Sequence, residues 1–170
     1  MAMYRKLSRT SSQRKALLRN QVTNLLYYGK IVTTEAKAKE VIKMADTIIA
    51  LAVKEKDNFE EVTVSAKVAR KDKDGKRVKE NGKTVYDTVE KKIKKDSPSR
   101  LHARRKMLET LYTITVKGDK KSETKTIDMA NYVFDEVAPK YATRNGGYTR
   151  IIKIGPRKGD NAMEVVLELV

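Results

Sequence analysis

Hydrophobic residues recur at helical spacing near the start of the chain. Leu18 is followed by apolar residues four, seven and eight positions later, which places all of them on one face of a helix. These are Val22, Leu25 and Leu26. Ser11 or Ser12 is typical of the N-cap of such a helix. Gly29 suits the left-handed position that ends one.

A second helix is predicted after a short β-like link, Ile31–Thr34. Thr33 or Thr34 can cap it, and Glu35 then stands in its first turn, where the helix dipole favours a negative charge. The apolar face is Val41, Ala45, Ile48, Ile49 and Ala52. The lysines expected in solvent are Lys37, Lys39 and Lys43. Because only about five residues join the two helices, we expect them to pack together.

Residues 54–96 follow a different pattern. Fourteen basic and ten acidic residues alternate along this segment. Apolar Val62–Val68 positions alternate with polar ones, which favours a half-buried strand. Asp74-Gly75 and Asn81-Gly82 are turn dipeptides, and the later apolar residues Val85, Val89 and Ile93 fit either a strand or a helix. We predict a long, solvent-rich β-hairpin inserted into the domain.

The last third of the chain predicts two more helices and a second hairpin. Leu101–Tyr112 forms the third helix, with Ser99 as its cap, and residues 117–125 form a polar loop. Ile127–Val137 forms the fourth helix, which ends near Pro139. Tyr148–Ile154 and Met163–Leu169 then pair as antiparallel strands. The expected fold is α+β, with helices packed on a small, mainly antiparallel sheet. Its parts are a basic arm at 1–10 and one domain at 11–170 that carries the insert.

The net charge of the chain indicates the kind of partner that it binds. The 170 residues include 38 Lys+Arg and 22 Asp+Glu, a net charge of +16. Self-repulsion opposes compaction, so a polyanion is the simplest compensating partner. The first thirty residues hold seven basic residues and no acid. Residues 4–10 lack a hydrophobic period and are expected to form an extended arm that binds nucleic acid by counterion release. The alternative is a disordered soluble tail.

The missing residue types exclude most catalytic chemistry. Without cysteine, disulfides, cysteine-ligated zinc and iron–sulfur clusters are excluded, and the chain fits a reducing cytosol. His102 is the only histidine, which excludes a multi-histidine metal site. It has no Ser or Asp partner at motif spacing, so we expect a solvated surface residue. Neither GxxxxGK[ST] nor GxGxxG occurs, and no window reaches the ~18 apolar residues of a membrane span. We predict no catalysis, cofactor, small-molecule substrate or membrane.

The stretch from Lys140 to Arg150 is the strongest local signal for nucleic-acid binding. Gly146 and Gly147 remove side chains where a phosphate backbone can approach. Arg144 and Arg150 can fork onto phosphates, and Tyr148 can stack on a base. Residues 140–160 hold six basic residues and one acid. The alternative is an ordinary Gly-Gly turn with a solvated basic rim.

A further basic cluster lies in the third helix. It comprises Arg100, Arg104, Arg105 and Lys106, with His102 among them. Four cations on two helical turns repel one another unless an anion faces them, so this cluster is a third candidate contact.

Four segments, taken in order, closely resemble one known family. They are Ser11–Ala16 (SSQRKA) with Arg19-Asn20, Ile31–Glu40 (IVTTEAKAKE), Arg144–Ile151 (RNGGYTRI) and Gly159–Ala162 (GDNA). The family is protein seventeen of the bacterial large ribosomal subunit. The resemblance covers about residues 4–55 and 100–170, whereas 54–96 resembles an insertion relative to the family's core.

The resemblance implies a cytoplasmic, non-enzymatic protein that binds 23S ribosomal RNA near the mouth of the peptide exit tunnel, beside other ribosomal proteins. Recognition through the phosphate backbone is expected, because side chains cannot read the A-form major groove. The residues expected to contact RNA are Arg5, Lys6, Arg9, Ser11, Arg14, Lys15, Arg19, Thr33, Thr34, Lys37, Arg100, Arg104, Arg105, Arg144, Gly146, Gly147, Tyr148, Arg150, Arg157 and Lys158.

Two other functions would explain part of these observations. A DNA-binding architectural protein or helix-turn-helix regulator would carry the same positive charge, but it should show a base-reading recognition helix and a dimer interface. Neither is evident. An RNA-processing enzyme needs clustered carboxylates, and the acids here are scattered.

Overall fold

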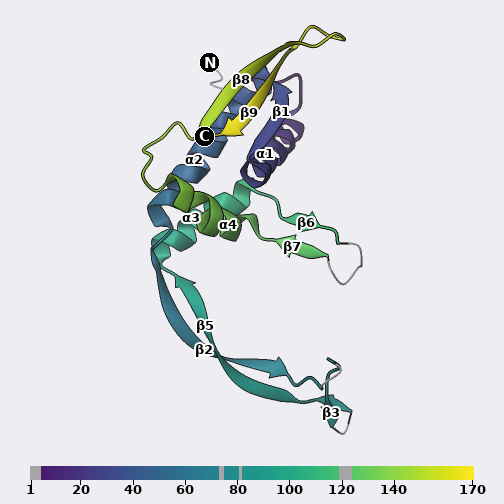
Figure 1. Ribbon diagram of the computed structural model, residues 1–170, viewed down its shortest axis with the longest axis vertical. Helices are drawn as coiled ribbons and strands as arrows, with labels where there is room; N and C mark the ends of the chain where they lie inside the picture. The colour runs from purple at the N-terminus through teal and green to yellow at the C-terminus, as the bar shows by residue number, and fades with distance from the viewer. Residues whose placement is uncertain (1–4, 73–74, 81, 119–123) are drawn as a thin grey trace. The chain divides into compact units, whose positions relative to one another are not determined.

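The computed structural model describes residues 5–72, 75–80, 82–118 and 124–170 (Figure 1). The chain divides into two units. The core unit comprises Met1–Asp57 and Ser99–Val170, and the ribbon unit comprises Asn58–Pro98.

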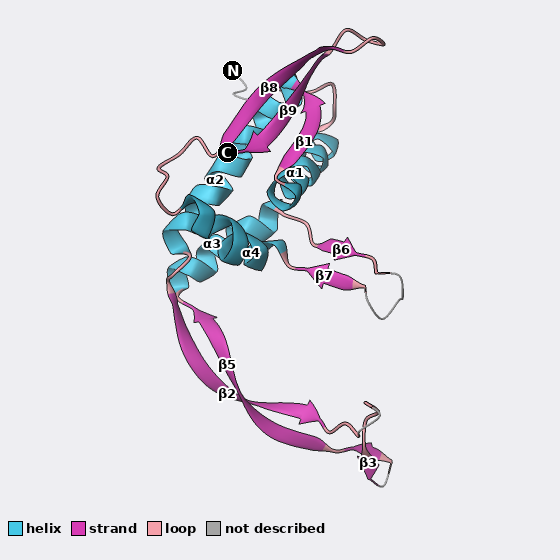
Figure 2. Ribbon diagram, in the orientation of Figure 1, coloured by secondary structure: helices cyan, strands magenta, loops and turns pink. Residues whose placement is uncertain are grey.

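Helices and a small antiparallel sheet form the core unit, which confirms the α+β prediction (Figure 2). Its elements are α1 (Ser11–Tyr28), β1 (Lys30–Thr34), α2 (Glu35–Glu55), α3 (Pro98–Thr110), β6 (Ile114–Val116), β7 (Lys125–Ile127), α4 (Met129–Tyr132), the π turn η2 (Val133–Val137), the 3₁₀ turn η3 (Ala138–Tyr141), β8 (Thr149–Pro156) and β9 (Met163–Leu169). The main sheet has the order β1-β9-β8, and both pairings are antiparallel. The predicted C-terminal hairpin is therefore confirmed.

Helix α2 is the centre of the core. It contacts α1, all three strands of the main sheet, and the η2 and η3 turns. The apolar face predicted for it, from Val41 to Ala52, is buried, with no member more than 4% exposed. Val165 and Leu167 of β9 are fully buried as well. Burial of this apolar surface is the main stabilising contribution.

The N-cap of α1 precedes both residues predicted for it, Ser11 and Ser12. Thr10 is the N-cap: its extended backbone precedes the helix, and its N–H donates to Gln13 Oε1 at 3.4 Å. Ser11 therefore lies inside the first turn. The predicted end is confirmed, because Gly29 has a φ of +78° and donates its N–H to the Leu25 carbonyl at 2.9 Å.

Replacing Gly29 by alanine tests that end. A Cβ at Gly29 meets nothing within 4 Å, so the cost is purely the strained left-handed backbone. We expect Gly29→Ala to lower the free energy of unfolding by about 1 kcal/mol. Gly159→Ala is the matched control, since its Cβ also meets nothing within 4 Å and its backbone is not left-handed. Equal unfolding free energies in urea for the two variants would contradict this account.

In its described part, residues 5–10, the basic arm is not extended, which corrects the prediction there. Arg9 donates its N–H to the Lys6 carbonyl at 3.2 Å, and Leu7 and Ser8 between them have φ values of 56° and 51°. The Arg5 N–H also donates to Glu40 Oε1 on α2 at 3.4 Å. A turn and an anchor to α2 therefore replace the open arm. Both use backbone groups, which a search for hydrophobic periodicity does not detect.

Two further predictions around α3 and α4 were wrong. Helix α3 begins at Pro98, a favoured first-turn residue, so Ser99 is not its cap and donates instead to Glu55 Oε2 at 2.8 Å. Ile127 pairs with Ile114 in the β6–β7 hairpin, and the next helix starts after it. Of the loop predicted at 117–125, residues 119–123 lie outside the described residues.

Helical backbone continues through Pro139, near which the fourth helix was predicted to end, and stops two residues later. The residue stands in the first turn of η3, where a missing N–H leaves no intrahelical hydrogen bond unmade. The widened π turn η2 immediately precedes η3. Helical turns therefore run on to Tyr141.

The ribbon unit confirms the inserted hairpin. Strands β2 (Phe59–Ala69) and β5 (Tyr86–Asp96) pair antiparallel over their full lengths, and β3 (Lys79–Glu80) pairs with β4 (Lys83–Thr84). The hairpin begins after residue 57 because α2 continues to Glu55. Val89 and Ile93 lie in β5, so the ambiguous second half is a strand. Of the predicted turn dipeptides, Asp74 and Asn81 lie outside the described residues.

Candidate RNA interface

The arm, the start of α2 and the β8–β9 loop, far apart in sequence, come together in the core unit. They line one hollow of about 490 Å³. Its basic residues are Arg5, Lys37, Lys39 and Arg157, and its acids are Glu35 and Asp160. Thr34, the N-cap of α2, lies in the same lining. The N-terminal N–H groups of a helix favour anions, so the hollow combines backbone donors with an excess of cations.

Ion pairs hold the walls of this hollow in place. Lys39 donates to Glu35 at 2.8 Å and, together with Lys153, holds the pKa of that carboxyl below its usual range. Arg157 binds Asp160 through Nε at 3.0 Å and Nη2 at 2.7 Å, which lowers the Asp160 pKa. The guanidinium of Arg157 is therefore oriented by a carboxylate, while Lys158 beside it is exposed.

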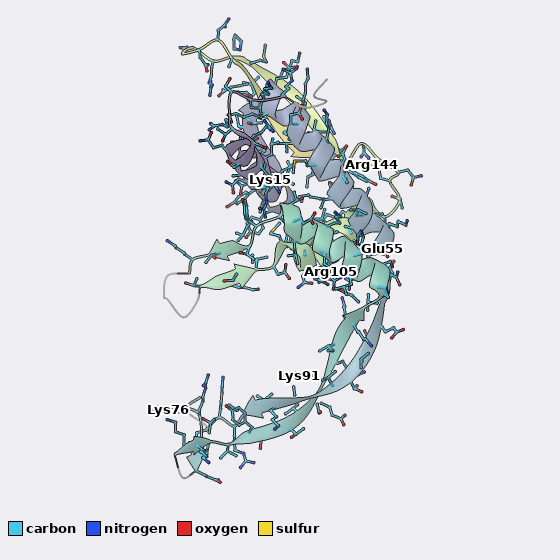
Figure 3. The ribbon with its side chains drawn as sticks, turned by 180° about the vertical axis from the view of Figure 1, so that it is seen from behind. Lys15, Glu55, Lys76, Lys91, Arg105 and Arg144 are labelled. Carbon is cyan, nitrogen blue, oxygen red and sulfur yellow. The ribbon has the colours of Figure 1, made fainter. Side chains whose placement is uncertain are left out.

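Some basic residues of α1 are exposed to solvent, and others pack against the rest of the core unit. Lys15 is exposed (Figure 3), as is Ser11, and Arg14 is half-buried. Arg19 instead donates its Nε–H to the Thr110 carbonyl at 3.0 Å. Its guanidinium carbon lies 4.1 Å from the centre of the Tyr112 ring. This cation–π contact joins α1 to the segment after α3.

The Gly-Gly turn keeps its arginines exposed but not its tyrosine. Arg144 and Arg150 are exposed (Arg144 in Figure 3), and a Cβ at Gly146 or Gly147 would meet nothing within 4 Å. The backbone here is therefore open to a close approach. Tyr148 is only 5% exposed, and its hydroxyl donates to the Arg144 carbonyl at 3.2 Å.

The aromatic ring of Tyr148 packs edge-on against Tyr141, with centroids 5.4 Å apart. The expectation that Tyr148 offers its ring to a base is therefore corrected: the ring belongs to the core. Thr33 is similar. It is 8% exposed, and its Oγ accepts a hydrogen bond from Gln21 Nε2 at 3.0 Å.

The basic cluster of α3 is also divided. Arg100 is 2% exposed, with its guanidinium carbon 4.4 Å from the Phe134 ring centre, and Arg104 lies 5.4 Å from the same ring. Arg104 also donates to Asn131 Oδ1. The aromatic face of Phe134 therefore lies against two of these cations. Arg105 (Figure 3) and His102 remain exposed, the latter as predicted.

Within the described residues, no group of three or more His, Cys, Asp or Glu side chains could hold a metal ion. No helix among them is long and apolar enough to cross a membrane.

Sequence comparisons identify the family. A statistical model of the family described as Ribosomal protein L17 matches residues 17–170 of the chain. The chain belongs to this family. L17-family members are structural constituents of the large ribosomal subunit and not enzymes, which confirms the resemblance and decides against the RNA-processing enzyme.

Curated L17-family relatives match along the whole chain. The large ribosomal subunit protein bL17 of Lachnospira eligens is 69% identical over 178 aligned positions, which cover 100% of both chains. The bL17 of Acetivibrio thermocellus is 49% identical over 179 positions, and that of Clostridium botulinum strain Hall is 39% identical over 170, both at full coverage. The alignments therefore include the ribbon unit.

The sequence did not predict the hollow at the start of α2. Lys39 was expected only to be solvated, yet it lines the hollow and binds Glu35. The spacing of Glu35 and Lys39, four positions apart on a helix, is a recognised ion-pair signal that could have indicated this contact. The approach of Arg157 to α2 depends on tertiary structure and has no local signal.

Proposed function

We propose that this protein binds 23S ribosomal RNA by clamping the phosphates of separate RNA segments, beside the mouth of the peptide exit tunnel. The observation that carries the proposal is the gathering of Arg5, Lys37 and Arg157 around one hollow at the start of α2. The tunnel location is what the family resemblance implies.

Phosphate contacts suit the groups that the surface offers. Exposed arginines and lysines neutralise phosphates and release counterions, and the N–H groups at the start of α2 add donors for an anion. The residues proposed to contact RNA are Arg5, Lys6, Arg9, Ser11, Arg14, Lys15, Thr34, Lys37, Arg105, Arg144, Gly146, Gly147, Arg150, Arg157 and Lys158. Thr33, Arg100 and Tyr148 are left out because they are buried, and Arg19 and Arg104 because their guanidinium groups pack on aromatic rings of the core unit.

Binding to 23S RNA is expected to depend steeply on salt. The logarithm of the binding constant should fall linearly with the logarithm of salt concentration, with a slope that corresponds to about 6–10 neutralised phosphates. Filter binding or fluorescence anisotropy at several salt concentrations measures the slope. A slope near zero would contradict phosphate recognition.

Two double variants test whether the proposed surfaces determine the salt dependence of RNA binding. Lys15→Gln with Arg144→Gln removes two proposed phosphate contacts and should reduce the slope by about two. Lys91→Gln with Lys92→Gln removes the same charge from exposed positions of β5 and should leave the slope unchanged. Equal reductions would show that general charge, not these surfaces, determines binding.

A further inference from the structure

A tyrosine cluster at the end of α1 carries an exposed aromatic surface outside the proposed RNA contacts. Tyr27 lies with its ring centroid 4.9 Å from that of Tyr28 and 5.6 Å from that of Tyr132. The Tyr132 hydroxyl donates to the Tyr27 carbonyl at 3.5 Å. Tyr28 is 66% exposed, the highest value among the large hydrophobic residues that the structure describes as exposed. Tyr132 therefore fixes Tyr27 in place, while the ring of Tyr28 is open to solvent.

This cluster borders two hollows. One, of about 830 Å³, is lined by the three tyrosines and by residues of β7, α4 and η2. The other, of about 400 Å³, is lined by the same tyrosines together with Tyr141, Leu169 and Val170. Because the tyrosines line both hollows, they form one continuous surface, which we call the tyrosine surface. Aromatic side chains exposed in this way are typical of interface centres.

The larger hollow is acidic, in contrast to the rest of the chain. Its charged lining residues are Asp128, Asp135 and Glu136 against the single base Lys125, whereas the chain as a whole carries a net charge of +16. Glu136 lies close enough that its charge, after the effect of burial, contributes to raising the pKa of the Tyr132 hydroxyl. Across both hollows, the tyrosine surface therefore has three carboxylates, all in the larger hollow, against Lys125 there and Lys140 in the smaller hollow.

We propose that the tyrosine surface docks a lysine- and arginine-rich segment of another protein of the large subunit. Phosphates would be repelled by the carboxylates, and a purely apolar partner would bury them without a counter-charge. A guanidinium or ammonium group, in contrast, pairs with carboxylates and packs on tyrosine faces, and its aliphatic stem covers the exposed rings. The inference rests on the proposed place of the chain in the large subunit.

Photo-crosslinking in intact large subunits tests the docking proposal. The full-length chain carries p-benzoylphenylalanine in place of Tyr28, and purified subunits are irradiated, digested and analysed by mass spectrometry. We expect a cross-link to a protein peptide with a net positive charge. Adding Glu136→Lys should reduce its yield at least about tenfold, because like charges then face each other.

Glu90→Lys is the matched control. It makes the same charge change at an exposed position of β5, and we expect it to leave the cross-link yield unchanged. A cross-link to rRNA, a cross-link to an acidic peptide, or a yield indifferent to Glu136→Lys would overturn the inference and leave the proposed RNA contacts standing. Absence of the chain from purified large subunits would overturn both proposals.

Discussion

Reversing the charges of Arg144 and Arg150 together is expected to reduce incorporation of the chain into large subunits by at least about tenfold. Both side chains are exposed around a turn whose glycines leave the backbone open. Arg144→Glu with Arg150→Glu removes two of the proposed phosphate contacts and places two negative charges where the proposal puts RNA phosphates. Mass spectrometry of purified subunits, with the variant co-expressed against a tagged wild-type chain, measures the ratio incorporated.

The control for this result is Lys91→Glu with Lys92→Glu. It changes the net charge by the same amount at exposed positions of the ribbon unit, and we expect near-normal incorporation. Circular dichroism of the isolated variants checks that both remain folded. Equal losses of incorporation would mean that the Gly-Gly turn has no special part in binding.

Of the stability variants proposed for this chain, Phe134→Ala is expected to lower the free energy of unfolding the most. The side chain is 2% exposed in the core, and Phe134→Ala should lower the free energy of unfolding by about 3–5 kcal/mol. Its ring also faces the guanidinium groups of Arg100 and Arg104 at 4.4 and 5.4 Å. Removing it leaves the Arg100 charge buried without this aromatic partner. Urea unfolding followed by circular dichroism measures the change.

Tyr86→Ala provides the comparison for Phe134→Ala. Tyr86 is 57% exposed in β5, and its truncation should change the free energy of unfolding by no more than about 0.5 kcal/mol. A Phe134→Ala variant as stable as Tyr86→Ala would show that the ring does not support the core.

Local sequence signals predicted the parts of the fold that local physics decides. Helical periodicity located α1 and the buried face of α2, and Gly29 marked the end of α1 because its left-handed backbone disfavours other residues. Alternation located β2 and the C-terminal hairpin. The β6–β7 hairpin was missed because strands of three residues are too short for a period to appear.

Charge alone did not reveal which basic residues face solvent. Arg19 and Arg100 were predicted to contact RNA, yet each packs on an aromatic ring contributed by a distant part of the chain. The long apolar stem of arginine permits both roles, so only tertiary structure separates them. Tyr148 is similar, since a tyrosine beside two glycines fits either a base or the core, and here Tyr141 provides the partner ring.

The measurement that tests the central claim most directly is ultraviolet crosslinking of intact large subunits, followed by mass spectrometry of nucleotide-linked peptides. The account predicts 23S nucleotides on the peptides that contain Lys15 and Arg144, the exposed cations of α1 and the Gly-Gly turn. Linked nucleotides confined to residues 58–98, or found on neither of these two peptides, would contradict it.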